Sequence, residues 1–94
     1  MNDPVIESKA DMLKRLRRIE GQVKGIQKMI DDDKSCSDII TQVSAVRAAI
    51  NKVGIIILEN YSATCFRNFE TEEQKERALK DLTKIMQSFM KFSN

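Results

Sequence analysis

Two cysteines, Cys36 and Cys65, are the residues of this chain with the most distinctive chemistry. Thiolates are nucleophiles and soft metal ligands, and in a reducing compartment such a pair is more often reactive or metal-binding than a structural disulfide. We expect Cys36 in the first turn of a helix, where unpaired backbone N–H groups favour a thiolate. A simpler interpretation, two small buried apolar side chains, stays open at this point.

A second group of chemically active residues is basic and lies near the amino end. Between Lys9 and Lys28 there are seven basic residues against two acidic ones, a local net charge of +5, although the whole chain carries only +2. A helical wheel places most of these side chains opposite the apolar ones. The surface suits phosphates, and its lack of aromatic residues favours contact with duplex DNA over stacking on single strands. A solvated helix face is the alternative.

The composition excludes most hydrolase chemistry. The 94 residues include no histidine, which removes histidine bases, imidazole metal ligands, and Ser-His-Asp and Cys-His catalysis. A thiol oxidoreductase or sulfur carrier is disfavoured as well, because the chain has neither a Cys-x-x-Cys pair nor a general base. We therefore predict a protein that is not an enzyme.

The length and hydropathy pattern predict one domain over residues 1–94, with residues 1–10 flexible. The amino end has no apolar core typical of a signal peptide. The longest continuous apolar run, Ile55 to Leu58, is far shorter than the roughly 20 residues that span a bilayer. We expect a cytoplasmic protein with no membrane partner.

Apolar residues at alternating steps of four and three predict an all-α protein with three helices. The first helix extends from about Met12 to the acidic run at residues 31–33. The second begins at Cys36, after a cap formed by Ser35 and Asp38, and continues to about Phe66. Its predicted seam comprises Ile39, Val43, Val46, Ile50, Val53 and Ile57.

A second capping box, Thr71 with Gln74, predicts the start of the third helix. The apolar side of this helix comprises Ala78, Leu82, Ile85, Phe89 and Phe92. A chain of this size builds a thin core by itself, so we expect it to form an oligomer.

The two cysteines cannot meet within one chain if both lie on the second helix. Their Cα atoms are then about 43 Å apart along its axis. They pair only if two copies of this helix pack antiparallel, in a register that sets Cys36 against Cys65 of the partner subunit. The register places Val43 against Leu58, Ile40 against Tyr61, Ile50 against Asn51 and Arg47 against Gly54.

Several separated segments resemble the copper-sensitive operon repressor family. They are the run from Leu13 to Ile26 (LKRLRRIEGQVKGI), Cys36, the run from Gln42 to Ala49 (QVSAVRAA), the triplet from Leu58 to Asn60, and Cys65. The resemblance implies an all-helical repressor that forms antiparallel dimers and then tetramers, and binds double-stranded operator DNA without a helix-turn-helix. It also implies release of DNA when the intersubunit cysteine site is occupied.

The resemblance further narrows the signal. Copper-sensing members hold Cu(I) with a Cys, His, Cys set, and the position of that histidine is Tyr61 in this chain; Ser35 stands where they tend to have a tyrosine. Nickel and cobalt branches need histidines, and the formaldehyde-sensing branch needs a proline where this chain has Asn2. The persulfide-sensing branch keeps two cysteines without the histidine. We therefore expect a persulfide sensor without a cofactor, with Cu(I) bound by the same cysteines as the alternative.

These arguments assign the expected roles. Cys36 and Cys65 are the sensing thiols, and Ser35 and Tyr61 lie near them. Arg47 has an alternative structural role at a dimer interface. The expected DNA contacts are Lys14, Arg15, Arg18, Lys24 and Lys28 on the first helix, with Arg47 and Lys52 on the second.

Overall fold

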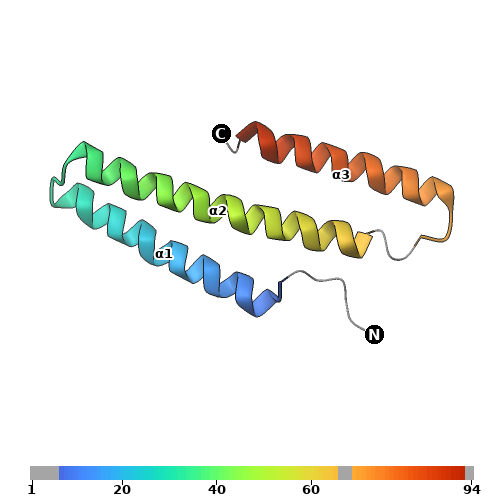
Figure 1. The fold of residues 1–94 in the computed structure, drawn as a ribbon, viewed down its shortest axis with the longest axis horizontal. Coiled ribbons are helices and arrows are strands. Elements are labelled where there is room, and N and C mark those ends of the chain that lie inside the picture. Colours follow the sequence, from blue (N-terminus) through green and yellow to red (C-terminus); the bar gives the residue numbers. More distant parts are fainter. Residues whose placement is uncertain (1–6, 66–68, 93–94) are drawn as a thin grey trace. The chain divides into compact units, whose positions relative to one another are not determined.

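The computed structural model describes residues 7–65 and 69–92, and in these residues it contains three α-helices (Figure 1). They are α1 (Lys9–Asp31), α2 (Cys36–Cys65) and α3 (Glu72–Phe92). The prediction of an all-α chain with a long second helix is confirmed. The chain divides into two compact units: one is Ser8–Val53, and the other comprises Glu7 and the described residues from Gly54 onward. Helix α2 contributes to both.

Helix α1 begins inside the segment expected to be flexible. The Ser8 side chain accepts a hydrogen bond from the backbone N–H of Asp11 at 3.1 Å, which satisfies one of the free donors of the first turn. The acidic run ends the helix as predicted, because Asp32 is its C-cap and Asp33 has a φ of 55°. Aspartate tolerates this left-handed conformation better than most residues with a side chain.

Both capping signals of the later helices are confirmed. Ser35 accepts a hydrogen bond from the backbone N–H of Asp38 at 3.1 Å, and α2 starts at the next residue. Thr71 accepts one from the backbone N–H of Gln74 at 3.1 Å. The Gln74 side chain accepts in turn from the backbone of Glu70 at 2.9 Å. These bonds explain why the helices begin where the sequence predicts.

The core of the described part of the chain is thin. Ile19, Val53 and Ile56 are its buried apolar side chains, with exposed fractions of 8%, 4% and 2%. Ile56 lies outside the seam predicted from the sequence. Small domains that fold alone generally have low stability, and a core of this size is consistent with that.

In the unit that includes the described residues from Gly54 onward, helix α3 approaches α2 closely at Gly54. A Cβ placed on this glycine would fall onto the Phe89 ring, 2.6 Å from its Cζ atom. Ala78, Leu82 and Phe89 are half-buried, as predicted for the apolar side of α3. Ile85 is instead exposed, and the Phe92 side chain lies outside the described residues. The glycine is the reason that a phenylalanine ring fits against this face of α2.

Helix α2 is long and apolar enough over Cys36–Tyr61 to cross a membrane, judged by length and composition alone. The run at residues 55–58 alone does not reveal this property, because the hydropathy of α2 is spread over many positions. Arg47 and Lys52 lie in the middle of this stretch. Each costs about 2.5–3.5 kcal/mol at the centre of a membrane helix, so burial against protein is the better use of this face.

Candidate sensor and DNA-binding surfaces

The two predicted sensing thiols lie at opposite ends of one helix. Cys36 is the first residue of α2 and its side chain is exposed, which excludes a buried structural role for it in the single chain. Cys65 is the last residue of α2, and its side chain lies outside the described residues. Among the described residues, no group of three His, Cys, Asp or Glu side chains could hold a metal ion. Because eight turns of helix separate the two cysteines, they cannot form a pair within one chain.

One exposed stripe of α2 contains Cys36 and ends near Cys65. Its members follow each other at steps of four and three, so they share one helix face. This α2 stripe consists of Cys36, Ile40, Val43, Arg47, Ile50, Gly54, Ile57 and Tyr61, all of them exposed except the half-buried Gly54. Ile40 is 55% exposed and Ile57 is 51% exposed. An apolar face this open needs a covering surface.

The seam predicted for the second helix combines two faces. Ile39, Val46 and Val53 are half-buried or buried, and they form the inward face. Val43 and Ile50, by contrast, are more than 40% exposed. Steps of four and three fit both faces of a helix that is apolar on two sides, and the sequence pattern does not separate them.

The predicted register of two antiparallel α2 helices meets one conflict. It uses the small Gly54 to admit a long Arg47 side chain from the partner subunit. In the structure the space above Gly54 is filled by the Phe89 ring of the same chain. Of the other pairings, Ile40 with Tyr61 joins two exposed stripe residues, whereas Leu58 and Asn51, the partners of Val43 and Ile50, are half-buried. All of these pairings stay predictions.

Tyr61 and Ser35 have different surroundings. Tyr61 belongs to the α2 stripe and is 39% exposed. Ser35 is exposed beside Cys36, and its hydroxyl serves as the α2 cap. Next to Tyr61, the Asn60 side chain donates a hydrogen bond to the backbone carbonyl of Glu7 at 3.0 Å. No sequence signal predicts this hydrogen bond, because its two residues are 53 positions apart in the chain.

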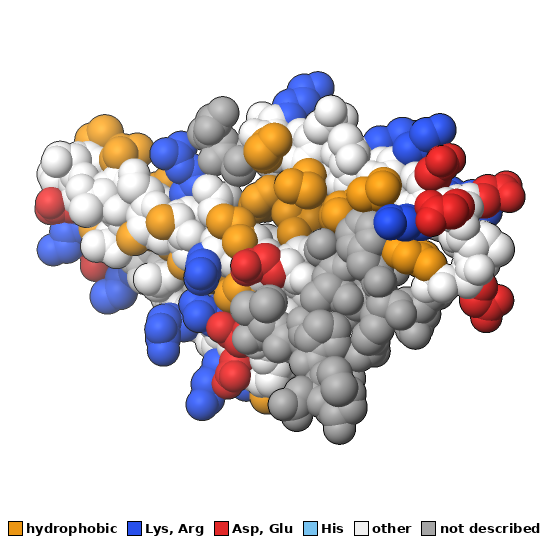
Figure 2. Space-filling view, turned by 45° about the vertical axis from the view of Figure 1, so that its right-hand side comes forward, with side chains coloured by type: hydrophobic (Ala, Val, Ile, Leu, Met, Phe, Trp, Pro, Cys, Tyr) orange, Lys and Arg blue, Asp and Glu red, His pale blue; other side chains and the backbone are white. Residues whose placement is uncertain are grey.

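All seven predicted DNA contacts lie in the unit Ser8–Val53. Six of them are exposed, and Arg15 is half-buried. Lys28 is held by an ion pair with Asp32 at 3.2 Å, which competes with a phosphate for its ammonium group. In Figure 2, Lys and Arg side chains lie on several parts of the visible face, with one group at its lower left and others along its upper edge.

The structure brings two of these arginines to one small hollow between α1 and α2. The hollow has a volume of about 190 Å³ and is lined by Arg15, Arg18, Ile19, Gln22 and Ala49. The sequence argument missed Gln22 and Ala49. Gln22 could have been found from its spacing, because it follows Arg15 by seven and Arg18 by four positions on the same helix face.

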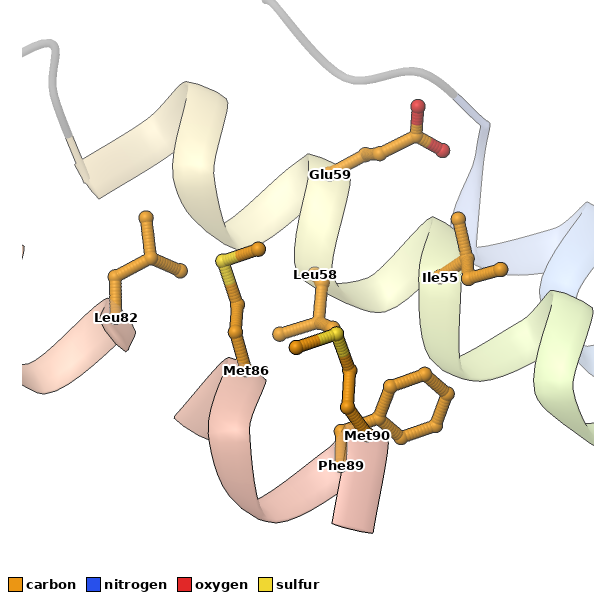
Figure 3. A pocket seen from close by; sticks show the side chains of 7 residues that line it. All are labelled: Ile55, Leu58, Glu59, Leu82, Met86, Phe89 and Met90. Atoms are coloured by element: carbon orange, nitrogen blue, oxygen red, sulfur yellow. The ribbon is translucent and has the colours of Figure 1, made fainter. Parts of the chain in front are cut away.

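A larger apolar groove lies in the other unit, between α2 and α3 (Figure 3). Its volume is about 420 Å³. Met86 and Met90 reach from α3 toward Leu58 of α2, while the Glu59 carboxylate points away from them. The lining is almost entirely apolar and flexible, as in surfaces that adapt to a partner.

Comparison with known proteins decides the family. The family described as "metal-sensitive transcriptional repressor" matches residues 8–88. The chain belongs to this family. Family membership confirms the prediction of a repressor over an enzyme, and it covers all three helices.

Relatives of this repressor family are similar over most of their length. The copper-sensing transcriptional repressor CsoR of Bacillus subtilis is 36% identical over 91 residues, which is 97% of this chain and 90% of that protein. The copper-sensing transcriptional repressor RicR of Mycobacterium tuberculosis is 46% identical over 59 residues, 63% of this chain and 62% of that protein.

Solved structures of the family confirm the three-helix fold. The nickel-responsive transcriptional regulator InrS has a TM-score of 0.78 at 31% identity, covering 88% of this chain and 93% of that one. The Cu(I)-bound repressor CsoR of Geobacillus thermodenitrificans has a TM-score of 0.75 at 37% identity, covering 89% and 91%. The assignment to a persulfide-sensing branch is not confirmed, since the relatives compared here are metal-responsive.

Proposed function

We propose that this chain is an operator-binding repressor that releases DNA when Cu(I) bridges Cys36 and Cys65 of the partner subunit. The observation that carries the proposal is the placement of the cysteines at the two ends of α2, next to or on an exposed apolar stripe. Two antiparallel copies of that stripe cover each other and create two equivalent thiol pairs. The named copper sensors among the relatives favour copper over the persulfide predicted from the sequence.

The donor set of this chain fits Cu(I) in a two-coordinate form. Thiolates are soft ligands that select Cu(I), and two of them suffice for linear coordination. Tyr61 supplies a hard phenol oxygen, which is a poor third ligand. The site therefore differs from a Cys, His, Cys set, and we expect weaker binding than such a set provides.

A second candidate signal is sulfane sulfur, and the absence of any histidine from the chain favours it. A polysulfide would transfer one sulfur atom to the Cys36 thiolate and leave as a shorter polysulfide. The thiolate of Cys65 of the partner subunit would then attack the inner sulfur of this persulfide, forming a disulfide and expelling hydrosulfide. Both signals use the same cysteines, so experiments must distinguish them.

The proposed release of DNA requires that the repressor bind DNA with different affinities in its bridged and unbridged states. A bridge between the ends of two α2 helices fixes one dimer geometry, and DNA prefers the other. Coupling of about 1–3 kcal/mol per site is typical of such systems. Two to four sites in a dimer or tetramer then supply roughly the 5.5 kcal/mol that reverses a two-state equilibrium.

The test measures operator binding and ligand binding on the same sample. Reduced protein is titrated with Cu(I) under chelator competition and, separately, with inorganic polysulfide. Fluorescence anisotropy follows a duplex taken from the DNA upstream of the chain's own coding sequence, and intact mass spectrometry follows added sulfur and crosslinks. Cys36→Ser and Cys65→Ser serve as matched variants that keep size and remove the thiol.

Each signal has a distinct outcome. Copper sensing predicts about one Cu(I) per subunit, DNA release by Cu(I), and loss of both in either variant. Sulfur sensing predicts crosslinked dimers and DNA release with polysulfide alone. DNA binding that ignores both reagents, or release that persists in both serine variants, would refute the proposed thiol switch.

A further inference from the structure

The residue that precedes the cap of α1 is tied to α2 by a side-chain hydrogen bond. The amide of Asn60 donates to the backbone carbonyl of Glu7 at 3.0 Å. Both residues are half-buried, so water competes less for this bond than for one on the open surface. Asn60 lies just before Tyr61 and within the last two turns of α2, which ends at Cys65. The bond therefore joins the sensor end of α2 to the start of α1.

A single planar peptide group links this bond to the cap of α1. The Glu7 carbonyl and the Ser8 N–H belong to one peptide unit, and such units resist twisting. Ser8 has the extended backbone of an N-cap, with φ −70° and ψ 157°. Its hydroxyl accepts from the N–H of Asp11 at 3.1 Å, and its carbonyl accepts from the N–H of Met12 at 3.0 Å. The first turn of α1 thus begins from a peptide group that Asn60 orients.

This link is one of two places where the chain passes between its compact units. Among the described residues, the chain crosses once between Glu7 and Ser8, and it crosses again between Val53 and Gly54, inside α2. All seven expected DNA contacts lie in the unit that contains α1, whereas Cys65 belongs to the other. A change at Cys65 reaches the basic side chains of its own chain by one of these two routes. Asn60 holds the first of them.

We propose that Asn60 is the positioning residue that couples the thiol pair to the basic surface. The proposal rests on the proposed repressor function. In the ligand-free state the Asn60 amide holds the Glu7 carbonyl and keeps the first turns of α1, with Lys14 and Arg15, in the geometry that binds DNA. A bridge at Cys65 displaces the end of α2, takes the amide away from the carbonyl, and lets these turns fray. The bond is then a difference between the two states, which a ligand needs in order to shift their equilibrium.

The test uses the full chain with substitutions on both sides of the shared peptide group. Asn60→Asp keeps the size of the side chain and replaces the N–H donor by a carboxylate oxygen, which cannot donate. Asn60→Ala removes the amide entirely. Ser8→Ala removes the cap hydroxyl, alone and combined with Asn60→Ala. Gln42→Ala is the matched control, because Gln42 is an exposed amide side chain of the same helix and lies outside the α2 stripe.

Two measurements are made on each variant. Fluorescence anisotropy gives the affinity of reduced protein for the duplex from upstream of its own coding sequence, first without ligand and then after addition of Cu(I) or of inorganic polysulfide. Hydrogen exchange followed by NMR gives the protection of the backbone N–H groups of Asp11 and Met12, which bond to Ser8. The exchange measurement needs neither DNA nor ligand, so it reports on the start of α1 directly.

We expect both Asn60 variants to bind the duplex at least about fivefold more weakly than the wild type in the ligand-free state, since one neutral hydrogen bond supplies about this factor. For Asn60→Ala the ligand-bound state stays within about twofold of the wild type, so the fold-release on ligand addition falls. Exchange at Asp11 and Met12 becomes faster in both variants and stays unchanged in Gln42→Ala. The double variant loses less than the product of the single losses, because both substitutions act through one peptide group.

Equal fold-release in the wild type and Asn60→Ala overturns the coupling role. Unchanged exchange at Asp11 and Met12 in both Asn60 variants also overturns it, because the bond then does not hold the start of α1. So do equal losses in Asn60→Ala and Gln42→Ala. If circular dichroism or solution mass shows that Asn60→Ala is altered, Asn60→Asp decides, because its fold-release compares two states of one variant and its added charge cancels.

The same data separate this proposal from the function on which it rests. A wild-type protein that fails to bind the duplex at low salt, or that neither reagent releases, refutes the proposed function and the coupling role with it. A wild type that binds and releases, with Asn60 variants that release equally well, refutes only the coupling role.

Discussion

Gly54 offers a sharp test of how α3 packs on α2. In Gly54→Ala the new methyl carbon lies 2.6 Å from the Cζ atom of Phe89, and it also meets the neighbouring Cε1 atom. Carbon atoms in contact are normally about 3.5–4.0 Å apart, so the ring or the helix must move by roughly 1 Å. Overpacking of this kind costs about 1–3 kcal/mol.

The same substitution also makes a favourable contribution to helix stability, which must be measured separately. Alanine is better than glycine in a helix interior by about 1 kcal/mol. Gly25 in α1 provides the control, because a Cβ at this position meets nothing within 4 Å. We expect Gly25→Ala to raise stability by up to about 1 kcal/mol and Gly54→Ala to fall below it by about 1–3 kcal/mol.

The assay is urea and thermal unfolding followed by circular dichroism, at one fixed protomer concentration because subunit association adds to apparent stability. The expected gap corresponds to a difference in Tm of at least about 4–8 °C for a domain of this size. Combining Gly54→Ala with Phe89→Leu removes the clashing ring and should recover part of the loss. If Gly54→Ala is as stable as Gly25→Ala and shows no coupling to position 89, the close approach of Phe89 to Gly54 is wrong.

Three further outcomes test other parts of the molecule. Tyr61→His adds an imidazole to the thiol pair and should raise Cu(I) affinity at least about tenfold under chelator competition, whereas Tyr61→Phe leaves it unchanged. Ser35→Ala removes the α2 cap and should cost about 1 kcal/mol in urea unfolding, and Ser35→Asp should restore it. Lys24→Ala should lower the salt slope of DNA binding by about 1 per contact in an anisotropy series. Lys28→Ala should lower it less, because its ammonium group is engaged by Asp32.

Local sequence signals predict the helices well because their physical causes are local. Each cap depends on a hydroxyl and a backbone N–H three residues apart, as Ser35 and Asp38 show. The end of α1 depends on an acidic run in which Asp33 adopts a left-handed conformation. The position of Cys36 follows from the same kind of signal, since it is the residue after the Ser35 cap, whereas no cap signal marks the end of α2 at Cys65.

Faces and pockets are harder to predict because they depend on contacts between helices. The spacing of Val43, Val46, Ile50 and Val53 is that of one seam, yet the four side chains divide between an inward and an exposed face. The hollow beside Gln22 exists because Ala49 is small and belongs to another helix. Neither property is encoded in the spacing along one segment.

The thin core and the exposed stripe have one common consequence for function. A chain with three buried apolar side chains in its described part has little stability to spare, and the apolar faces of α2 and α3 remain open. In the proposed antiparallel dimer, a second copy covers these faces and, by the same contact, brings Cys36 to Cys65 of the partner subunit. Folding, assembly and sensing then depend on one interface. Under the proposed function, a ligand at the thiol pair would act directly on the geometry that DNA binding requires, and no relay beyond the hydrogen bond from Asn60 to Glu7 would be needed to connect the signal to the basic surface.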